Sequence, residues 1–499
     1  MKTMKRLSTY ISISAILTLS SLNGCESFLQ KDPQGALISA LFPVTEADAL
    51  LVTNAAYATF RENGYHFGLF PILDIMSDDA HKGSNPGDQQ STIGPYDNFT
   101  FSSTTDGGDL DNWWSTLYKG IKRANVVIVK VPAIKMDTVL RNRNVAEARF
   151  IRATLYYDLV RAWGGVPIVT NLDPPAKLVR STKEEVYSLI ISDLTYAISR
   201  LPEKSEQAAK DIGRATKGAA KSYLAKVYLF QADFPNAEKY AKEVIDSSKY
   251  GLEPIFTDAN SVNGEQGIES IFEVGAQGVE AEAGDQYGNV QGVRGTPNRG
   301  WGFNRPTPNL RNSFEPGDPR IKGTIIDLGD TLDGVVIAGD GQTADVTLLP
   351  DNTVWETECY NRKVWTPGIN VPSQFAYNRR LMRYADVLLM AAEASNENGH
   401  TPQALTYLNK VRERARQGNN SILPDITETK KDLLRDIILN ERRHELAMEG
   451  HRFWDLVRTN KAAAVLGPLG FISGKHELLP IPQTQIDLGQ GSLTQNPNW

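Results

Sequence analysis

Cysteine is almost absent from this sequence, with only Cys25 and Cys359 among 499 residues. Two cysteines allow one disulfide at most, so a fold held together by several disulfides is excluded. Cys359 has no histidine within twenty residues of it in the sequence. We therefore expect Cys359 to be a buried structural thiol and not a catalytic one.

Clustered positive charge and catalytic motifs are also lacking. The net charge is −6, and Lys and Arg form no basic stripe, so nucleic acid and anionic lipid surfaces are poor partners and neutral ligands are favoured. The chain has no Gly-x-Ser-x-Gly elbow, and residues 275–302 contain no dinucleotide-binding glycine motif. Residues 467–475 have the wrong spacing for a phosphate loop. We expect no catalytic residue, no cofactor and no metal.

An uncharged run at residues 7–22 is too short and too rich in Ser and Thr for a membrane span, which needs ~20 mostly apolar residues. Three basic residues precede the run, and Leu22-Asn23-Gly24-Cys25 follows it. This order is typical of a bacterial export signal that ends at a lipid-modified cysteine. We predict a signal peptide at 1–24 and lipidation of Cys25. Asn23 is unusual at its position, and a plain secretory leader is the alternative.

Helical periodicity is abundant in the first half and the last quarter of the chain. Val186, Ile190 and Leu194 represent a pattern in which apolar residues recur at three and four positions. Paired helices with Ala at their contacts and a polar turn between them are typical of tetratricopeptide repeats, although the consensus Trp and Gly are absent. The predicted pairs are 214–249, 381–416, 46–60 with 113–131, and 145–163 with 183–200. The fold class expected is mainly α, a tetratricopeptide-like scaffold of about four helix pairs with long irregular loops and a few short β-hairpins.

The middle of the chain, about 251–375, has a different composition. Residues 271–274 read as a short strand, and eight glycines follow between 275 and 302. Asp333-Gly334 and Gly339-Asp340-Gly341 suggest small hairpins. Long irregular segments on a rigid scaffold commonly carry binding function, and the alternative is that they only cap the helix pairs. We expect one domain over 25–499, with helical repeats at about 36–250 and 376–460 and a ligand region at about 251–375.

The densest charge lies in the run that begins at Glu441 and ends at Arg458. Carboxylates and guanidinium groups alternate at helical spacing, so we expect Glu441 and Glu445 to meet partners about one turn away. A zinc-binding helix needs two His one turn apart with a Glu between them, and His444 has no such mate. The run predicts a helical corner held by ion pairs, with a break at Gly450.

Several segments resemble, in the same order, those of the SusD/RagB family of outer-membrane glycan-binding lipoproteins. The resemblance runs from Cys25 to Trp499 and includes Trp114-x-x-x-Tyr118-Lys-Gly-Ile121, Glu147-Ala-Arg149-Phe-Ile-Arg152, Trp163-Gly-Gly165-Val-Pro167, Arg383-Tyr-Ala-Asp386, Asn440-Glu-Arg-Arg-x-Glu445-Leu, Glu449-Gly-x-Arg452-x-Trp-Asp455 and Leu479-Pro-Ile-Pro482. Most of these residues belong to the expected scaffold, so the resemblance bears more on fold and partner than on the ligand.

The resemblance implies a non-catalytic nutrient-uptake protein at the cell surface, attached to the outer membrane by a lipid on Cys25. Such a protein binds an oligosaccharide or polysaccharide and delivers it to a SusC-like TonB-dependent transporter. Two alternatives stay open: peptide binding, known from one branch of the family, and a surface glycosidase.

Trp301 is the main candidate for contact with a sugar, because the C–H faces of sugars stack on aromatic rings. It stands between Gly300 and Gly302, which allow the backbone to present the indole outward. Tyr287 and Phe303 are secondary candidates from the same region. The alternative for Trp301 is an ordinary core position.

The resemblance places a first ligand loop after residue 74, at Asp78, Asp79, His81 and Lys82. Relatives often carry an arginine or an aromatic residue there, so this chain departs from a starch-like site. Trp163 and Trp454 belong to scaffold motifs and are expected in the core.

Replacement of Cys25 by Ala tests the predicted anchor. If Cys25 carries the lipid, the variant moves from the outer-membrane fraction to a soluble fraction in fractionated cells. Retention of Cys25→Ala in the membrane of a strain without the transporter contradicts the prediction.

Overall fold

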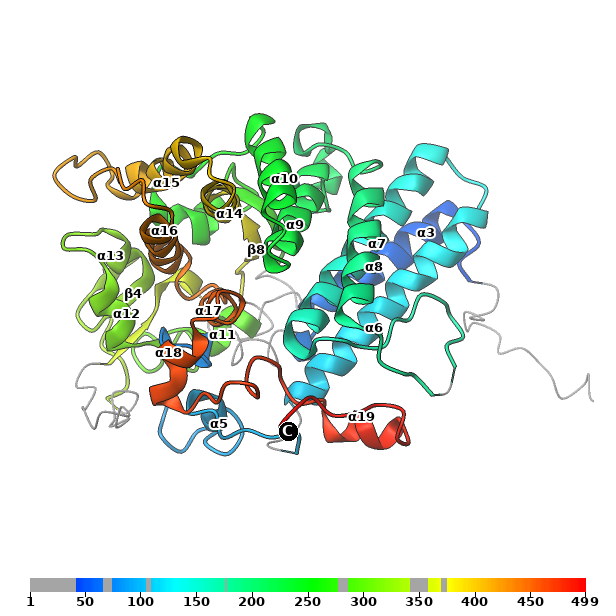
Figure 1. Ribbon diagram of the computed structural model, residues 1–499, viewed down its shortest axis with the longest axis horizontal. Helices are drawn as coiled ribbons and strands as arrows, with labels where there is room; N and C mark the ends of the chain where they lie inside the picture. The colour runs from blue at the N-terminus through cyan, green and yellow to red at the C-terminus, as the bar shows by residue number, and fades with distance from the viewer. Residues whose placement is uncertain are drawn as a thin grey trace, which may run out of the picture.

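The computed structural model describes residues 42–65, 74–104, 109–175, 177–276, 286–341, 358–368 and 375–499. Residues 1–24 and Cys25 lie outside this range, as do residues 342–357, which follow the hairpin signal at Gly339-Asp340-Gly341. Helices make up most of the described structure, and the strands are short (Figure 1). Within the described residues, every helix is too short or too polar to cross a membrane.

All four predicted helix pairs are present, each with its two helices packed together (Figure 1). They are α3 (Glu46–Tyr57) with α6 (Asp109–Lys130), α7 (Thr138–Trp163) with α8 (Lys183–Ile198), α9 (Lys217–Phe230) with α10 (Phe234–Asp246), and α14 (Tyr384–Glu397) with α15 (Thr401–Ala415). α10 also packs against α14, so the C-terminal pair continues the stack. The mainly helical fold expected from the sequence is confirmed.

Local sequence explains where several of these helices begin. Thr182 accepts a hydrogen bond from the Glu185 amide, and the Glu185 carboxylate accepts one from the Thr182 amide, which forms a capping box before α8. Thr45 and Asp48 form the same arrangement before α3. These caps satisfy amides that have no partner inside the helix.

Aromatic side chains fill the core between α6 and α7. The rings of Trp113 and Trp163 lie 4.9 Å apart, and both side chains are fully buried. The Trp163 indole donates a hydrogen bond of 2.9 Å to the Pro480 carbonyl, which ties the C-terminal segment to the helices. Trp454 is also buried, so both predicted core tryptophans are confirmed.

In the part of the chain that the structure describes, the strands form four two-stranded antiparallel ladders. These are β1 (Ala80–Gly83) with β3 (Phe303–Pro306), β2 (Ser270–Val274) with β8 (Arg379–Arg383), β4 (Ile325–Asp327) with β7 (Cys359–Asn361), and β5 (Thr331–Leu332) with β6 (Val335–Val336). β2 and the β5–β6 hairpin are the predicted strand and hairpin. Asp333 and Gly334 have φ of 50° and 77°, as two-residue hairpin turns require. Cys359 is buried on β7, and burial raises the pKa of its thiol to about 12.

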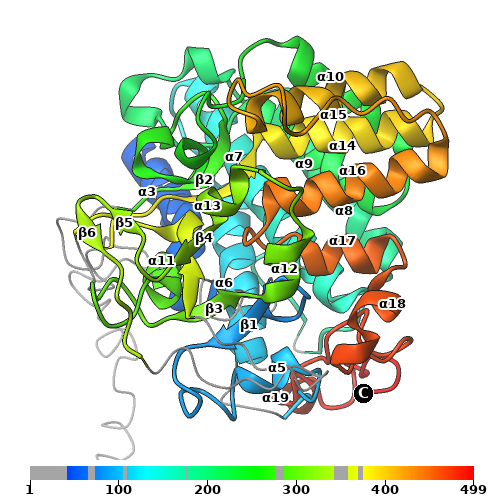
Figure 2. The same ribbon diagram turned by 90° about the vertical axis from the view of Figure 1, so that its left-hand side faces the viewer.

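The remaining helices of the described residues are mostly short. They are α5 (Gly94–Asp97), α11 (Gln286–Gln291), α12 (Pro308–Ser313), α13 (Arg320–Thr324), α17 (Arg452–Arg458), α18 (Ala462–Leu466) and α19 (Gln483–Leu488), with the longer α16 (Lys431–Leu446) beside α14 and α15. β3 lies beside β1, and the β5–β6 hairpin lies at the edge of the molecule (Figure 2).

The carboxylates of α16 find their partners on other elements. Glu445 accepts hydrogen bonds from Arg383 at 2.8 Å, from Arg320 at 3.3 Å and from Arg414. Glu441 is bound by Arg320 at 2.6 Å and by Arg412 at 2.8 Å.

The corner held by ion pairs is therefore present, but the pairing within one turn of the helix that we expected for Glu441 and Glu445 is wrong. Arg442, for example, binds Asp386 and Asp455. Partners on β8, α13 and α15 are better placed because they can enter the dry side of the helix, where Glu445 is fully buried.

Replacement of Glu445 by Ala should destabilise the protein by about 3–5 kcal/mol at pH 7, because it leaves buried guanidinium groups without their carboxylate. Burial raises the pKa of Glu445, but the guanidinium groups of Arg414, Arg383 and Arg320 outweigh this effect and lower the pKa to about 2. A depressed pKa means that this stabilisation is complete above the unfolded pKa near 4.5 and is lost as pH falls toward 2.

Chemical denaturation at several pH values measures this effect. The stability difference between parent and Glu445→Ala should shrink as pH falls through that window. Glu413→Ala, at an exposed position on the neighbouring helix α15, is the control and should change stability little. Equal stability of parent and Glu445→Ala at pH 7 contradicts the prediction.

Candidate functional site

An open depression of about 600 Å³ surrounds Trp301. Trp301 is 39% exposed, which is unusual for a residue with so large an apolar group in this protein. The depression is lined by Ser84, Asp88, Gln89, Arg294, Gly295, Asn298, Gly300, Trp301, Phe303 and Asp340. It therefore combines an aromatic surface with amide, hydroxyl and charged groups.

Backbone hydrogen bonds hold Trp301 in place while its side chain stays outside. The Trp301 amide donates to the Asn289 carbonyl at 3.1 Å, and the Gly302 amide donates to the Gly292 carbonyl at 2.9 Å. The Gly302 carbonyl in turn accepts from the Ser84 amide at 2.7 Å. The main chain around Trp301 is thus fixed on both sides, so the ring is presented on a defined support.

Two glycines permit this close approach of backbone segments. A Cβ on Gly300 would lie 2.1 Å from the Asn289 carbonyl oxygen and 2.6 Å from the Gly292 Cα. A Cβ on Gly83, which has a φ of +70°, would lie 2.4 Å from the Gly302 carbonyl oxygen. Any larger residue at Gly300 must move the backbone that carries Trp301.

The charged groups in the depression are paired with one another. Arg294 donates to Asp340 at 2.8 Å, to the Ser84 hydroxyl at 2.7 Å and to Asp88. These contacts fix the guanidinium between two chain segments that are far apart in sequence. A neutral, hydrogen-bonding ligand suits such a surface better than a highly charged one.

The predicted residues Asp78 and Asp79 do not line this depression. Asp78 is bound by Arg452 at 2.8 Å and by Arg443 at 2.9 Å, and Asp79 is bound by Arg443 at 2.7 Å. Both side chains are buried. Their contacts join the segment before β1 to α16 and α17, so the structure gives these carboxylates a positioning role.

His81 and Lys82 are likewise buried within their own loop. His81 Nδ1 lies 2.9 Å from the Asp97 carboxylate. Lys82 Nζ donates to the carbonyls of Gly83, Asn85 and Asp88 at 2.8–2.9 Å. Burial lowers the pKa of Lys82 to about 8. The lysine holds the segment from Gly83 to Asp88 together through these carbonyls. Neither His81 nor Lys82 lines the depression.

The two secondary aromatic candidates differ from each other. Phe303 lines the depression beside Trp301, although most of its ring is buried. Tyr287 is buried on α11, where the Arg379 guanidinium lies 4.0 Å from its ring centroid. The structure therefore brings Trp301 and Phe303 together, and it separates Tyr287 from them.

Sequence reasoning missed the polar part of the depression, which consists of Ser84, Asp88, Gln89, Arg294, Asn298 and Asp340. These residues lie on three separated segments, and only Asp340 belongs to a pattern noted in the sequence, the hairpin signal Gly339-Asp340-Gly341. Their only signal was their place in glycine-rich stretches, which do not show which polar side chains meet.

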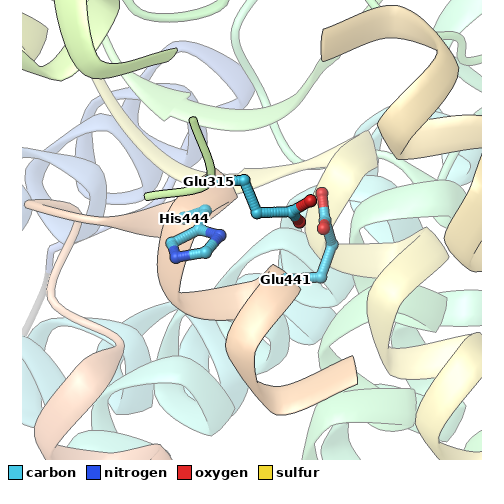
Figure 3. Close-up of side chains that lie close together, drawn as sticks. All are labelled: Glu315, Glu441 and His444. Carbon is cyan, nitrogen blue, oxygen red and sulfur yellow. The ribbon is translucent and has the colours of Figure 1, made fainter. Parts of the chain in front are cut away.

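A second cluster of potential ligand groups consists of Glu315, Glu441 and His444 (Figure 3). The two carboxylates are directed toward each other, with the imidazole to one side (Figure 3). Arg412 binds both carboxylates, and Arg320 takes the other oxygen of Glu441. Burial lowers the pKa of His444 to about 4, and its ring stacks on Phe314. Because guanidinium groups already neutralise these carboxylates, the cluster fits an ion-pair core better than a cation site.

Comparison with known proteins identifies relatives of the whole chain. Residues 268–470 match the family model described as "SusD family", and residues 77–229 match one described as "Starch-binding associating with outer membrane". The SusD-like protein P2 of Formosa agariphila is 30% identical over 511 residues, which cover 98% of this chain and 99% of the relative. SusD-like protein P38 of the same organism is 28% identical, and the match covers 96% of this chain and 97% of the relative.

Solved structures agree in fold over most of their length. A laminarin-binding SusD-like protein is 29% identical with a TM-score of 0.77, and the match covers 92% of this chain and all of that one. Surface glycan-binding protein A from Bacteroides thetaiotaomicron, in complex with laminarihexaose, is 27% identical with a TM-score of 0.73. The match covers 91% of this chain and 100% of that one.

Replacement of Gly300 by Ala should destabilise the protein by about 1–3 kcal/mol, since the added methyl group forces the backbone contact with Asn289 and Gly292 apart. Thermal unfolding measures the loss, and hydrogen exchange should show faster exchange of the Trp301 amide. Gly87→Ala is the matched control, because an added Cβ there meets nothing within 4 Å. Equal melting temperatures for the two variants contradict the proposed constraint.

Proposed function

Because the chain belongs to the SusD family, we propose that it binds a neutral glycan without catalysis, at the depression around Trp301. The support from relatives is the carbohydrate named for two structures of similar fold, a laminarin-binding protein and a complex with laminarihexaose. Both carbohydrates belong to one class of neutral glucan, which makes that class the first to test.

The observation that carries the proposal is the exposed ring of Trp301 beside polar groups. A sugar has apolar C–H faces and a rim of hydroxyls, so it needs an aromatic platform and several hydrogen-bonding partners. Asn298, Gln89 and the Arg294 network surround the platform. The volume of about 600 Å³ lies within the usual range for small-ligand sites.

We also propose that the protein works at the outer cell surface, attached through a lipid on Cys25, and passes its ligand to a SusC-like TonB-dependent transporter. The family description "associating with outer membrane" supports the location. A single SusD-like domain would extend from Cys25 to Trp499. Its ligand region would combine the segment at about 251–375 with the loop around Ser84, because both line the depression.

Replacement of Trp301 by Ala tests the site. The loss of one stacking platform should cost ~1–3 kcal/mol of binding free energy, equivalent to a roughly 5- to 150-fold weaker Kd. Isothermal titration with laminarihexaose measures the change, and circular dichroism checks the fold.

Three further variants serve as comparisons. Trp499→Ala removes a part-buried tryptophan outside the depression and should leave affinity unchanged. Tyr287→Ala should weaken binding less than Trp301→Ala, and Trp163→Ala should destabilise the fold because that ring is fully buried. Parent-like binding by Trp301→Ala removes this residue from the site. If the parent protein binds peptides and no glycan, the peptide-binding alternative is favoured.

A further inference from the structure

A second open depression, of about 310 Å³, lies against the β5–β6 hairpin. Its lining includes Phe256, Asp258, Asn263, Asp333, Arg362 and Trp365. Like the first depression, it places a partly exposed tryptophan among amide and charged groups. Its volume is large enough for a small ligand group.

Arg362 is the unusual residue of this second depression. Its side chain forms no ion pair and no hydrogen bond with any residue that the structure describes, and it is partly buried. By contrast, the adjacent Lys363 has protein partners: it binds Glu449 at 2.5 Å and the Glu445 carbonyl at 2.8 Å. A partly desolvated guanidinium with five donors and no protein acceptor is suited to donate hydrogen bonds to oxygen atoms of a ligand.

Trp365 supplies the apolar surface next to Arg362. Its indole nitrogen donates to Asp333 at 2.6 Å, which fixes the ring against the hairpin turn. Asp258 is likewise engaged, since it accepts from the Asn263 side chain at 3.2 Å. Acidic and basic groups both line the depression, so a strongly acidic ligand is disfavoured and a neutral, hydroxyl-rich one is favoured.

Segments that line the two depressions are in direct contact with each other. Arg299, two residues before Trp301, donates to the Gly368 carbonyl at 2.9 Å and lies 5.9 Å from the Trp365 ring centroid. The Thr296 amide donates to Gly339 at 2.8 Å, so the segment that leaves the β5–β6 hairpin reaches the first depression at Asp340. The segment that carries Trp301 is therefore attached through Arg299 to the segment that carries Trp365.

We propose that the depression at Arg362 and Trp365 is a second subsite for the same neutral glycan, so that a long chain contacts both tryptophans. The inference rests on the proposed function at Trp301. A polysaccharide that occupies both subsites gains affinity from the second contact at high effective concentration, whereas a trisaccharide occupies only one subsite at a time.

The test compares Kd values for a β-glucan polysaccharide, laminarin, and for its trisaccharide. Trp365→Ala and Arg362→Ala should each weaken polysaccharide binding on the order of tenfold and leave trisaccharide binding at the Trp301 subsite unchanged. Trp301→Ala should weaken both ligands. Arg416→Ala, whose side chain pairs with the exposed Asp425 outside both depressions, is the matched control for loss of an arginine.

Circular dichroism and thermal unfolding establish that each variant is folded. If removal of Trp365 disturbs the hairpin, Arg362→Ala alone tests whether the second subsite exists. Parent-like polysaccharide binding by a folded Arg362→Ala overturns the second subsite. That result leaves the proposed function intact as long as Trp301→Ala still loses binding. Parent-like binding of both ligands by Trp301→Ala contradicts the proposed function instead.

Discussion

Buried ion pairs at the end of α16, and at Glu449 just beyond it, connect this corner of the chain to α13, β8 and α15. Glu441, Glu445 and Glu449 recur at four-residue spacing and are bound by arginines from α13, β8 and α15. Removing such groups from water is costly, so each carboxylate needs several charge-assisted hydrogen bonds to be stable in the interior. The network satisfies this need, and it fixes the irregular half of the chain against the helix pairs.

The next residues of the same corner position the candidate site. Arg443 binds Asp79, Arg452 binds Asp78, and the Gly450 amide donates to Asp74 at 2.9 Å. These contacts hold the segment that leads into β1. β1 pairs with β3 so that Gly83 lies opposite Phe303, next to Trp301. The helical corner and the exposed tryptophan are thus mechanically linked, although 140 residues or more separate them in sequence.

This linkage changes how the loop at 74–83 is understood. Its acidic residues look suitable for a ligand, but their partners are arginines of the scaffold. The surface that we propose for the ligand is instead made by what the loop supports, namely an aromatic ring and polar groups whose charges are already paired. A surface of that kind discriminates by shape and hydroxyl pattern more than by charge, which suits neutral glycans.

The helix pairs were predictable from the sequence because apolar periodicity and capping residues act over a few positions. The β5–β6 hairpin and the outward presentation of Trp301 were predictable for the same reason, since Asp333-Gly334 and the glycines at 300 and 302 act locally. The partners of Glu445, the burial of Asp78 and Asp79, and the meeting of Arg294 with Asp88 and Asp340 were decided only by the tertiary structure. Charged side chains bind whichever opposite charge the fold brings within reach in a dry environment, and no local pattern in the sequence encodes that distance.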